Sequence, residues 1–243
     1  MSSIQFLSDY HFNNETQVDF KQPKHNTWRI VQKLGEKCSR VDKTETNGGA
    51  KSYAAGLFLC ENTLDTSRYA HMRIYMQVPM IGTEYEPPSK RAKQATQVTP
   101  REALAFLKFN EEGSTITPAL LGYKDTIQDD DMPVPGEFLV ILVWEIVPGL
   151  RLGDHVSHKQ FLKLDEAEQN LIRENFLQGY KRLREFGFLP FFGTPKNLIW
   201  DRDNAKVYFV DFYRCIEVGP GTQTDDGILA AWHLKEQTSS DLK

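Results

Sequence analysis

A run of seven consecutive apolar residues, FLVILVW at 138–144, constrains the fold more than any other stretch of the chain. Because successive side chains of a strand point to opposite faces of its sheet, a strand that is apolar throughout has both faces covered. The run is much shorter than the ~20 apolar residues needed to cross a bilayer. The sequence therefore predicts a central strand in a sheet that is packed on both sides, and it predicts no association with a membrane.

The rest of the first half is typical of an antiparallel sheet with one inserted helix. Thr99 is a suitable N-cap, Pro100 suits the first helical position and Glu102 completes a capping box, so a helix is expected over residues 100–110. Short apolar and β-branched runs bounded by turn residues predict strands, the last two forming a hairpin, at residues 28–34, 54–61, 69–79, 117–127 and 136–147.

In the second half the apolar residues recur at helical spacing instead. A long helix is predicted over residues 165–187, opened by Asp165 and Glu168 in a box-like start. Two short strands, NLIWD and KVYFVDF, and a last helix, DDGILAAWHLKE, follow it. The predicted organisation is an N-terminal segment, a β-rich lobe, a reduced helical lobe and a disordered tail, at residues 1–27, 28–147, 148–236 and 237–243.

Composition excludes several classes of protein. The formal net charge of −4 gives no overall attraction to nucleic acid, and we expect no binding to DNA. The three cysteines are far apart and form no CxxC pair, so neither a zinc site nor a disulfide framework is expected. His155 and His158 lack a third ligand at suitable spacing, and we predict no metal site there. The N-terminus lacks the basic and apolar regions of a signal peptide, which favours a cytoplasmic protein.

The order of these predicted elements resembles the protein-kinase-like fold, and in particular the small stand-alone kinase-like proteins of filamentous fungi. The resemblance is carried by MPVPGEFLVILVWEIVPGLRLGD, by the long helix ending in REFGF, and by PKNLIWD followed by KVYFVDF. It covers roughly residues 50–220. It implies a two-lobed α+β fold: a small antiparallel N-lobe sheet with one helix, and a reduced helical C-lobe.

The resemblance also assigns positions to the expected catalytic groups. When the kinase pattern H-R-D-x-x-x-x-N is aligned on Asn197, Phe192 occupies the position of the catalytic aspartate. The metal-binding aspartate falls on Asp211, the strand lysine falls near Arg73, and its helix partner is Glu102 or a neighbour.

Three of the expected groups are therefore altered or missing. No aspartate lies anywhere in residues 187–197, so shifting the alignment does not restore the catalytic base. The glycine-rich phosphate loop should lie near LGEKCSRVD, where only Gly35 remains, and arginine is a poor substitute for the strand lysine. Ordinary kinase activity is therefore not expected.

Two interpretations of such a degenerate kinase-like chain remain open. In the first, the chain is a pseudokinase-like binding or scaffold protein, in which Asn197 and Asp211 hold the loop by hydrogen bonds and Mg²⁺ or a nucleotide can bind. In the second, which is our leading prediction, the resemblance implies a tRNA-dependent, arginine-containing cyclodipeptide synthase that uses arginyl-tRNA and no cofactor. Residual small-molecule phosphotransfer is a third alternative.

The synthase interpretation assigns a role to each candidate residue. Asp211, Glu145 and Asn197 would be catalytic, and the substrate would be bound by Asp154, Arg73, Glu102 and Phe192. Its physical support is that Glu145, Asp154 and Asp211 are expected in apolar surroundings, where a carboxylate pairs strongly with a guanidinium group. The RNA backbone would be bound by Lys90, Arg91 and Lys93 in a salt-dependent manner.

Overall fold

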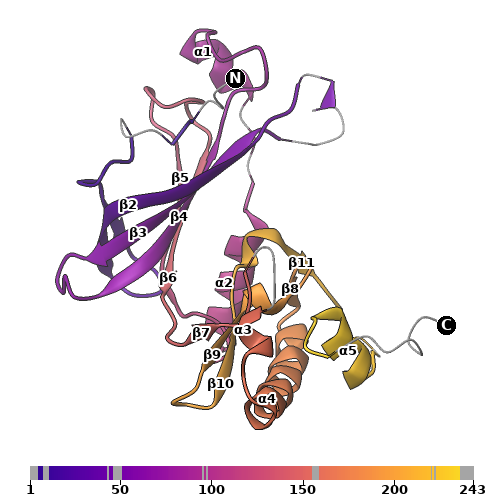
Figure 1. Cartoon of the computed structure of the whole chain (residues 1–243). Helices are drawn as coiled ribbons and strands as arrows, with labels where there is room; N and C mark the ends of the chain where they lie inside the picture. Colours follow the sequence, from indigo (N-terminus) through magenta and orange to yellow (C-terminus); the bar gives the residue numbers. More distant parts are fainter. Residues whose placement is uncertain are drawn as a thin grey trace. The chain divides into compact units, whose positions relative to one another are not determined.

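The computed structural model describes residues 5–7, 11–42, 44–45, 51–94, 96, 98–154, 159–219, 221 and 223–235. The chain has a mixed α+β structure with an antiparallel N-terminal sheet, as the sequence predicted (Figure 1). It divides into two compact units. Unit 1 comprises Met1–Ala103 and Leu120–Ile146, and unit 2 comprises Leu104–Ala119 and Val147–Lys243.

Unit 1 is built on a six-stranded antiparallel sheet with the strand order β1-β2-β3-β4-β6-β5. Its strands are β1 (Gln17–Phe20), β2 (Asn26–Ser39), β3 (Tyr53–Asn62), β4 (Tyr69–Gln77), β5 (Leu120–Ile127) and β6 (Phe138–Glu145). The apolar run forms β6, which pairs with β4 on one side and β5 on the other, so the predictions of a central strand and of a hairpin are confirmed. Segment 1–27 also contributes to the sheet, because β1 within it pairs with β2.

The two edges of this sheet meet at one end. The backbone N–H of Tyr123 in β5 donates to the carbonyl of Gln22, just after β1, at 2.9 Å. The Asn26 side chain donates to the carbonyl of Leu121 at 2.6 Å. A Cβ at Gly122 would lie 2.7 Å from the ring of Phe20, so the close approach of the two edges requires glycine there. The sheet is therefore curled.

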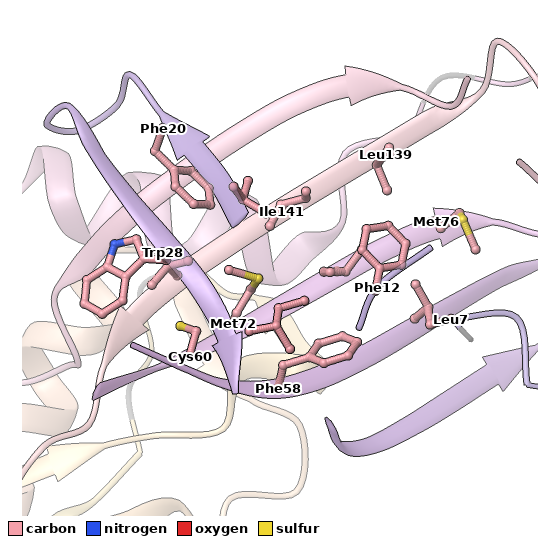
Figure 2. Packing of buried hydrophobic residues seen from close by; sticks show 14 of the residues in the cluster. Leu7, Phe12, Phe20, Trp28, Phe58, Cys60, Met72, Met76, Leu139 and Ile141 are labelled. Atoms are coloured by element: carbon pink, nitrogen blue, oxygen red, sulfur yellow. The ribbon is translucent and has the colours of Figure 1, made fainter. Parts of the chain in front are cut away.

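The core of unit 1 fills one face of this sheet. Figure 2 shows Phe58, Cys60 and Met72 packing with Trp28 and Phe12. The side chains of strand β4 alternate between the two faces of the sheet: Met72, Ile74 and Met76 enter this core, while His71, Arg73 and Tyr75 occupy the intervening positions that face the other side. The full cluster of buried residues is Leu7, Phe12, Val18, Phe20, Trp28, Ile30, Ala54, Phe58, Cys60, Ala70, Met72, Ile74, Met76, Val78, Leu139, Ile141 and Val143.

The position expected for a phosphate-binding loop differs from the prediction. Gly35 lies inside β2, opposite Leu57 of β3, and a shift of register between Lys33 and Gly35 leaves Leu34 as an exposed bulge. Strand β2 continues to Ser39, so LGEKCS is strand rather than loop. Gly48 and Gly49 lie outside the described residues.

Unit 2 combines short antiparallel strand pairs with helices. Helix α2 (Arg101–Glu111) begins in unit 1 and belongs to unit 2 from Leu104 onward. Strands β7 (Leu150–Arg151), β9 (Leu198–Asp201) and β10 (Lys206–Phe209) form one sheet, and β8 (Phe188–Pro190) pairs with β11 (Cys215–Glu217). The remaining elements are helical: α3 (Lys159–Leu162), α4 (Glu166–Glu185), η3 (Pro195–Asn197), η4 (Phe212–Arg214) and α5 (Asp225–Ala231).

Aromatic side chains supply much of the core of unit 2. Phe109 of α2 stacks edge-on against Phe212 of η4, with ring centroids 4.8 Å apart. Phe176 of α4 contacts Phe209 at 5.5 Å and Trp232 at 5.1 Å. These contacts bury the strand that leads into residues 210–212, so the segment that carries Asp211 starts from a rigid base.

The start of α4 is fixed to strand β9. Asp165 accepts a hydrogen bond from the backbone N–H of Glu168 at 2.8 Å, which confirms the predicted cap. The Glu168 carboxylate accepts bonds from the Trp200 indole at 2.7 Å and from Arg202 at 2.6 and 2.8 Å. The hydrogen bonds from Arg202, followed by that from Trp200, hold the pKa of Glu168 below its ordinary value.

This pKa shift predicts that Glu168→Gln destabilises the protein in a pH-dependent way. The carboxylate form of Glu168 stabilises the fold above the unfolded-state pKa of ~4.3, and this contribution is lost as pH falls through the lower folded-state pKa. We expect the variant to unfold at a lower temperature than the wild type at neutral pH, and the gap to narrow in acid. Thermal unfolding across pH measures it, with Glu174→Gln on the exposed side of α4 as control. A gap independent of pH would contradict the expectation.

Three smaller features complete the fold. Helix α5 ends at Ala231, earlier than the predicted residue 236, and the tail 237–243 lies outside the described residues, as do His155 and His158. Cys60 and Cys215 are buried, Cys38 is exposed, and all three cysteines are free. None of the helices in the described part of the chain is long and apolar enough to cross a membrane.

Candidate functional site

Unit 1 contains a buried pair of opposite charges. Arg73 lies on β4 and Glu102 in the first turn of α2, and Arg73 Nε lies 2.9 Å from Glu102 Oε2. The N–H of Arg73 is not aligned on this oxygen, so the contact is an ion pair rather than a well-formed hydrogen bond. The structure thus brings together the two residues that the sequence placed at the strand cation and its helix partner.

Tyr75 lies two residues after Arg73, on the same face of β4, and contacts the same carboxylate. Its hydroxyl donates to Glu102 Oε2 at 2.7 Å, and Tyr75, Arg73 and Glu102 are all buried. The Arg73 guanidinium also lies over the ring of Trp144, 5.5 Å from its centroid. The capping box predicted a local structural role for Glu102, whereas its carboxylate contacts strand β4. Two side chains of one strand therefore fix Glu102 in a single arrangement.

Unit 2 contains the loop that the resemblance aligns with a kinase catalytic loop. Strand β8 ends at Pro190, and it is followed by Phe191 and Phe192, which are 45% and 75% exposed as whole residues. Their ring centroids lie 4.0 Å apart. Phe192 has φ = 55°, which is a rare conformation for a bulky residue. The sequence placed Phe192 at the position of the catalytic base, and the structure shows an exposed phenyl ring there.

Asn197 uses its side chain within the protein. Its oxygen accepts from the backbone N–H of Thr194 at 3.3 Å, and its nitrogen donates to the carbonyls of Val210 at 3.2 Å and Asp211 at 3.5 Å. The residue is 3% exposed. Asn197 therefore ties the loop to the segment that carries Asp211, and its carboxamide is occupied by these bonds.

Asp211 is exposed and also lies in a rare backbone conformation. Its φ and ψ are 63° and 65°, and it immediately precedes η4. Within the described ranges its carboxylate has no hydrogen-bond or ion-pair partner. Strained, exposed polar residues of this kind gather at functional sites, so Asp211 is the strongest candidate for ligand contact in unit 2.

The residues in this part of unit 2 offer few ligands for a metal site of the kinase type. That site needs an aspartate and an asparagine oxygen together, and the Asn197 oxygen already accepts one hydrogen bond, from the backbone N–H of Thr194. Among the residues that the structure describes, no group of three His, Cys, Asp or Glu side chains could hold a metal ion.

The acidic residues assigned to an arginine site are less buried than predicted. Asp154 and Asp211 are exposed in unit 2, so the expectation of apolar surroundings is wrong for both. Both follow apolar segments in the sequence, but each lies where the chain leaves its strand. Glu145 is half-buried at the end of β6 in unit 1.

The basic residues assigned to RNA form a short helical turn. Lys90 and Arg91 belong to α1 (Pro88–Arg91), and Lys93 belongs to η2 (Ala92–Gln94). Lys90 and Lys93 are exposed, while Arg91 is half-buried. These residues therefore form a short basic helical turn at the surface, and their role in RNA binding stays a prediction.

Sequence reasoning missed two contributors to these sites. Tyr75 carried a usable signal, since it lies two residues after Arg73 and therefore on the same face of β4. Thr194 carried another, because Thr-Pro followed by Asn at the third helical position is typical of a cap, and Asn197 accepts from Thr194 in that way.

Comparisons with known proteins identify no family. No family model matches the chain, and no curated protein matches it. A solved kinase, PK-1 of the Cydia pomonella granulovirus, is similar in structure, with a TM-score of 0.47 and 13% sequence identity. The match covers 79% of this chain and 53% of the viral chain, so this chain spans about half the length of that kinase.

Proposed function

We propose that the chain is a two-lobed protein-kinase-like protein, with unit 1 as the N-lobe and unit 2 as a reduced C-lobe. The support is the order of its elements. Strands β2 to β6 form the five-strand core of the N-lobe, with α2 inserted between β4 and β5. The long helix α4, a loop and the short strands β9 and β10 follow in the order expected for this fold.

On this scaffold the chain acts as a pseudokinase-like binding module and not as an ordinary phosphotransferase. The observation that carries this proposal is Phe192, an exposed phenyl ring where a kinase needs the carboxylate that orients the attacking hydroxyl. A phenyl ring cannot accept a proton, and residues 187–197 contain neither aspartate nor glutamate. The buried Arg73–Glu102 pair and the internally bonded Asn197 support a structural rather than a catalytic use of the remaining motif residues.

An arginine-containing cyclodipeptide synthase that draws on arginyl-tRNA is the second candidate. It is favoured by the exposed Asp211 carboxylate, which could accept a guanidinium or serve as a base. The exposed Lys90 and Lys93 could contact an RNA backbone. Only under this candidate does Glu145 have a catalytic role. Substrate binding would then be the role of Asp154, Arg73, Glu102 and Phe192.

A direct test measures nucleotide binding and turnover in one sample. We expect Mg-ATP to raise the unfolding temperature of the purified chain, since any ligand that binds only the folded state stabilises it, by about 1.4 kcal/mol at ten times its Kd. We expect no phosphate transfer to the chain itself, to proteins or to small-molecule acceptors above that of Asp211→Asn. Calorimetric unfolding and mass spectrometry of the acceptors provide the two readouts.

Either of two outcomes would overturn this proposal and favour another function. Phosphate transfer that disappears in Asp211→Asn would make the chain a residual phosphotransferase. An arginine-containing cyclic dipeptide in cells that express the chain, absent from cells that express Asp211→Asn, would establish the synthase. Glu217→Gln, at an exposed acid on β11, is the matched control for both.

A further inference from the structure

A buried carboxyl group lies at the end of the unit 1 sheet. Glu137 immediately precedes β6 and is 1% exposed. Its carboxyl group accepts hydrogen bonds from the backbone N–H groups of Phe138 and Thr96. Its Oε2 atom has no hydrogen-bond donor among the residues that the structure describes. Ionisation of this group is costly, because burial disfavours the charged form.

Thr96 belongs to the segment that connects β4 to α2. This β4–α2 segment, residues 78–100, carries α1 and η2. Gln77, at the end of β4, donates to the carbonyl of Gln94 at 2.9 Å and accepts from the Thr96 hydroxyl at 3.0 Å. Gln128, which follows β5, donates to the carbonyl of Gln77 at 3.0 Å. Buried side chains at the ends of β4, β5 and β6 therefore hold this segment on the sheet.

The charges around Glu137 do not offset its burial. Burial raises the pKa of the Glu137 carboxyl group above its ordinary value, and this effect outweighs the bonds from Phe138 and Thr96 and the attraction of the Lys51 cation, which lower the pKa. The other groups bonded to this stretch, Gln77 and Gln128, are neutral. Charged side chains of the preceding loop and of the β4–α2 segment are exposed or half-buried, where water and salt screen them: Asp129, Asp130, Asp131, Glu84, Glu86, Lys90, Arg91 and Lys93.

The two backbone groups that Glu137 contacts differ in how easily they can move. Phe138 starts β6, which pairs with both β4 and β5, so its N–H is fixed. Thr96 lies outside the helices and strands, in the connecting segment. Water therefore reaches an ionised Glu137 at the least cost when Thr96 moves away. We propose that Glu137 is a proton-operated latch, which holds the β4–α2 segment on the sheet while its carboxyl group is protonated and releases Thr96 when the group ionises.

The latch responds to pH in a defined direction. The closed form binds the proton more tightly than the open or unfolded form, because the pKa of Glu137 is raised only where the group is buried. The closed form is therefore most stable below the ordinary carboxyl pKa of ~4.3, and it loses stability as pH rises through its own higher pKa. The latch thus controls the segment that carries the basic helical turn and leads into α2. This inference does not depend on the proposed function.

Hydrogen exchange of the Thr96 amide, followed by NMR on the full chain without added ligand, tests the latch. We expect its protection, corrected for the intrinsic exchange rate, to fall between about pH 4 and about pH 8, roughly tenfold for each pKa unit that separates the closed and open forms. The NMR signal of the Glu137 carboxyl carbon should titrate over the same range. The amide of Tyr123, which bonds to the carbonyl of Gln22, is the internal reference and should not follow.

Three variants separate the latch from a general effect of pH. Glu137→Gln keeps the shape of the side chain but cannot ionise, so the protection of Thr96 should no longer depend on pH. Lys51→Met should move the titration of Glu137 to higher pH, because it removes an attracting charge. Asp130→Asn, which removes an exposed carboxylate from the preceding loop, should leave both readouts unchanged.

Several results would overturn the proposal. It fails if Glu137 titrates at or below the ordinary carboxyl pKa of ~4.3, if the protection of Thr96 in the wild type is constant with pH, or if Glu137→Gln keeps the wild-type dependence. If Glu137→Gln does not fold, the wild-type titration and the Lys51→Met shift decide the question. Because no nucleotide is present, failure of the ATP experiment leaves this result unaffected.

Discussion

Gly149→Ala is expected to unfold unit 2 or to lower its free energy of unfolding by at least about 3 kcal/mol. Gly149 has φ = 120°, a conformation that L side chains rarely adopt. A Cβ at this position would lie 2.3 Å from the carbonyl oxygen of Trp200 and 2.9 Å from the backbone nitrogen of Asp201. Both contacts are with backbone, so no side-chain rotation relieves them. The methyl group would separate β7 from β9, which pair through Leu150 and Trp200.

Denaturant unfolding followed by tryptophan fluorescence measures this effect, since Trp200 and Trp232 are both buried in unit 2. Gly219→Ala is the matched control, because a Cβ there would meet no atom within 4 Å. The control should stay within about 0.5 kcal/mol of the wild type, as surface substitutions usually do. If Gly149→Ala is as stable as this control, the close approach of β7 to β9 is wrong.

Removal of one member of the buried ion pair has the second large effect. Glu102→Ala leaves the Arg73 guanidinium and the Tyr75 hydroxyl without their shared acceptor, and all three residues are buried. Breaking a buried pair in this way destabilises proteins by about 3–5 kcal/mol. We expect a loss of this size in unfolding by heat or denaturant.

The double variant Arg73→Met/Glu102→Leu separates this explanation from simple loss of packing. It removes both charges and keeps side chains of similar length. We therefore expect it to be more stable than Arg73→Met alone and than Glu102→Leu alone. Tyr75→Phe, which removes one hydrogen bond only, should lose about 1 kcal/mol. If the two single losses instead add in the double variant, Arg73 and Glu102 do not act as a pair.

Much of unit 1 could be predicted because its signals are local. The apolar run of β6, the alternation of β4 and the N-terminal signals of α2 each depend on a few neighbouring residues. Strand β1 was not predicted, because QVDF is short and half polar. The core residues Leu7 and Phe12 precede it in a segment without periodicity, and only the fold shows where they pack.

For the candidate sites, too, some features could be predicted from the sequence and others depend on the fold. The resemblance to the kinase-like fold assigned Arg73 and Glu102, or a neighbour of Glu102, to the strand cation and its helix partner, and the roles of both residues stay predictions. The exposure of Asp211 was missed because the residues before it are apolar, while its left-handed backbone turns it out of the strand. The occupied carboxamide of Asn197 depends on Thr194 and Val210, and the contact with Val210 is thirteen residues distant in sequence.

The meeting of β5 with the residue after β1 has a consequence for self-association. Unpaired strand edges offer backbone N–H and C=O groups that can template pairing with another chain. Here Gln22 and Tyr123 pair with one another, and the Asn26 side chain binds the carbonyl of Leu121. At this end of the sheet, those backbone groups are therefore already satisfied within one molecule, and a second copy finds no open edge there to extend.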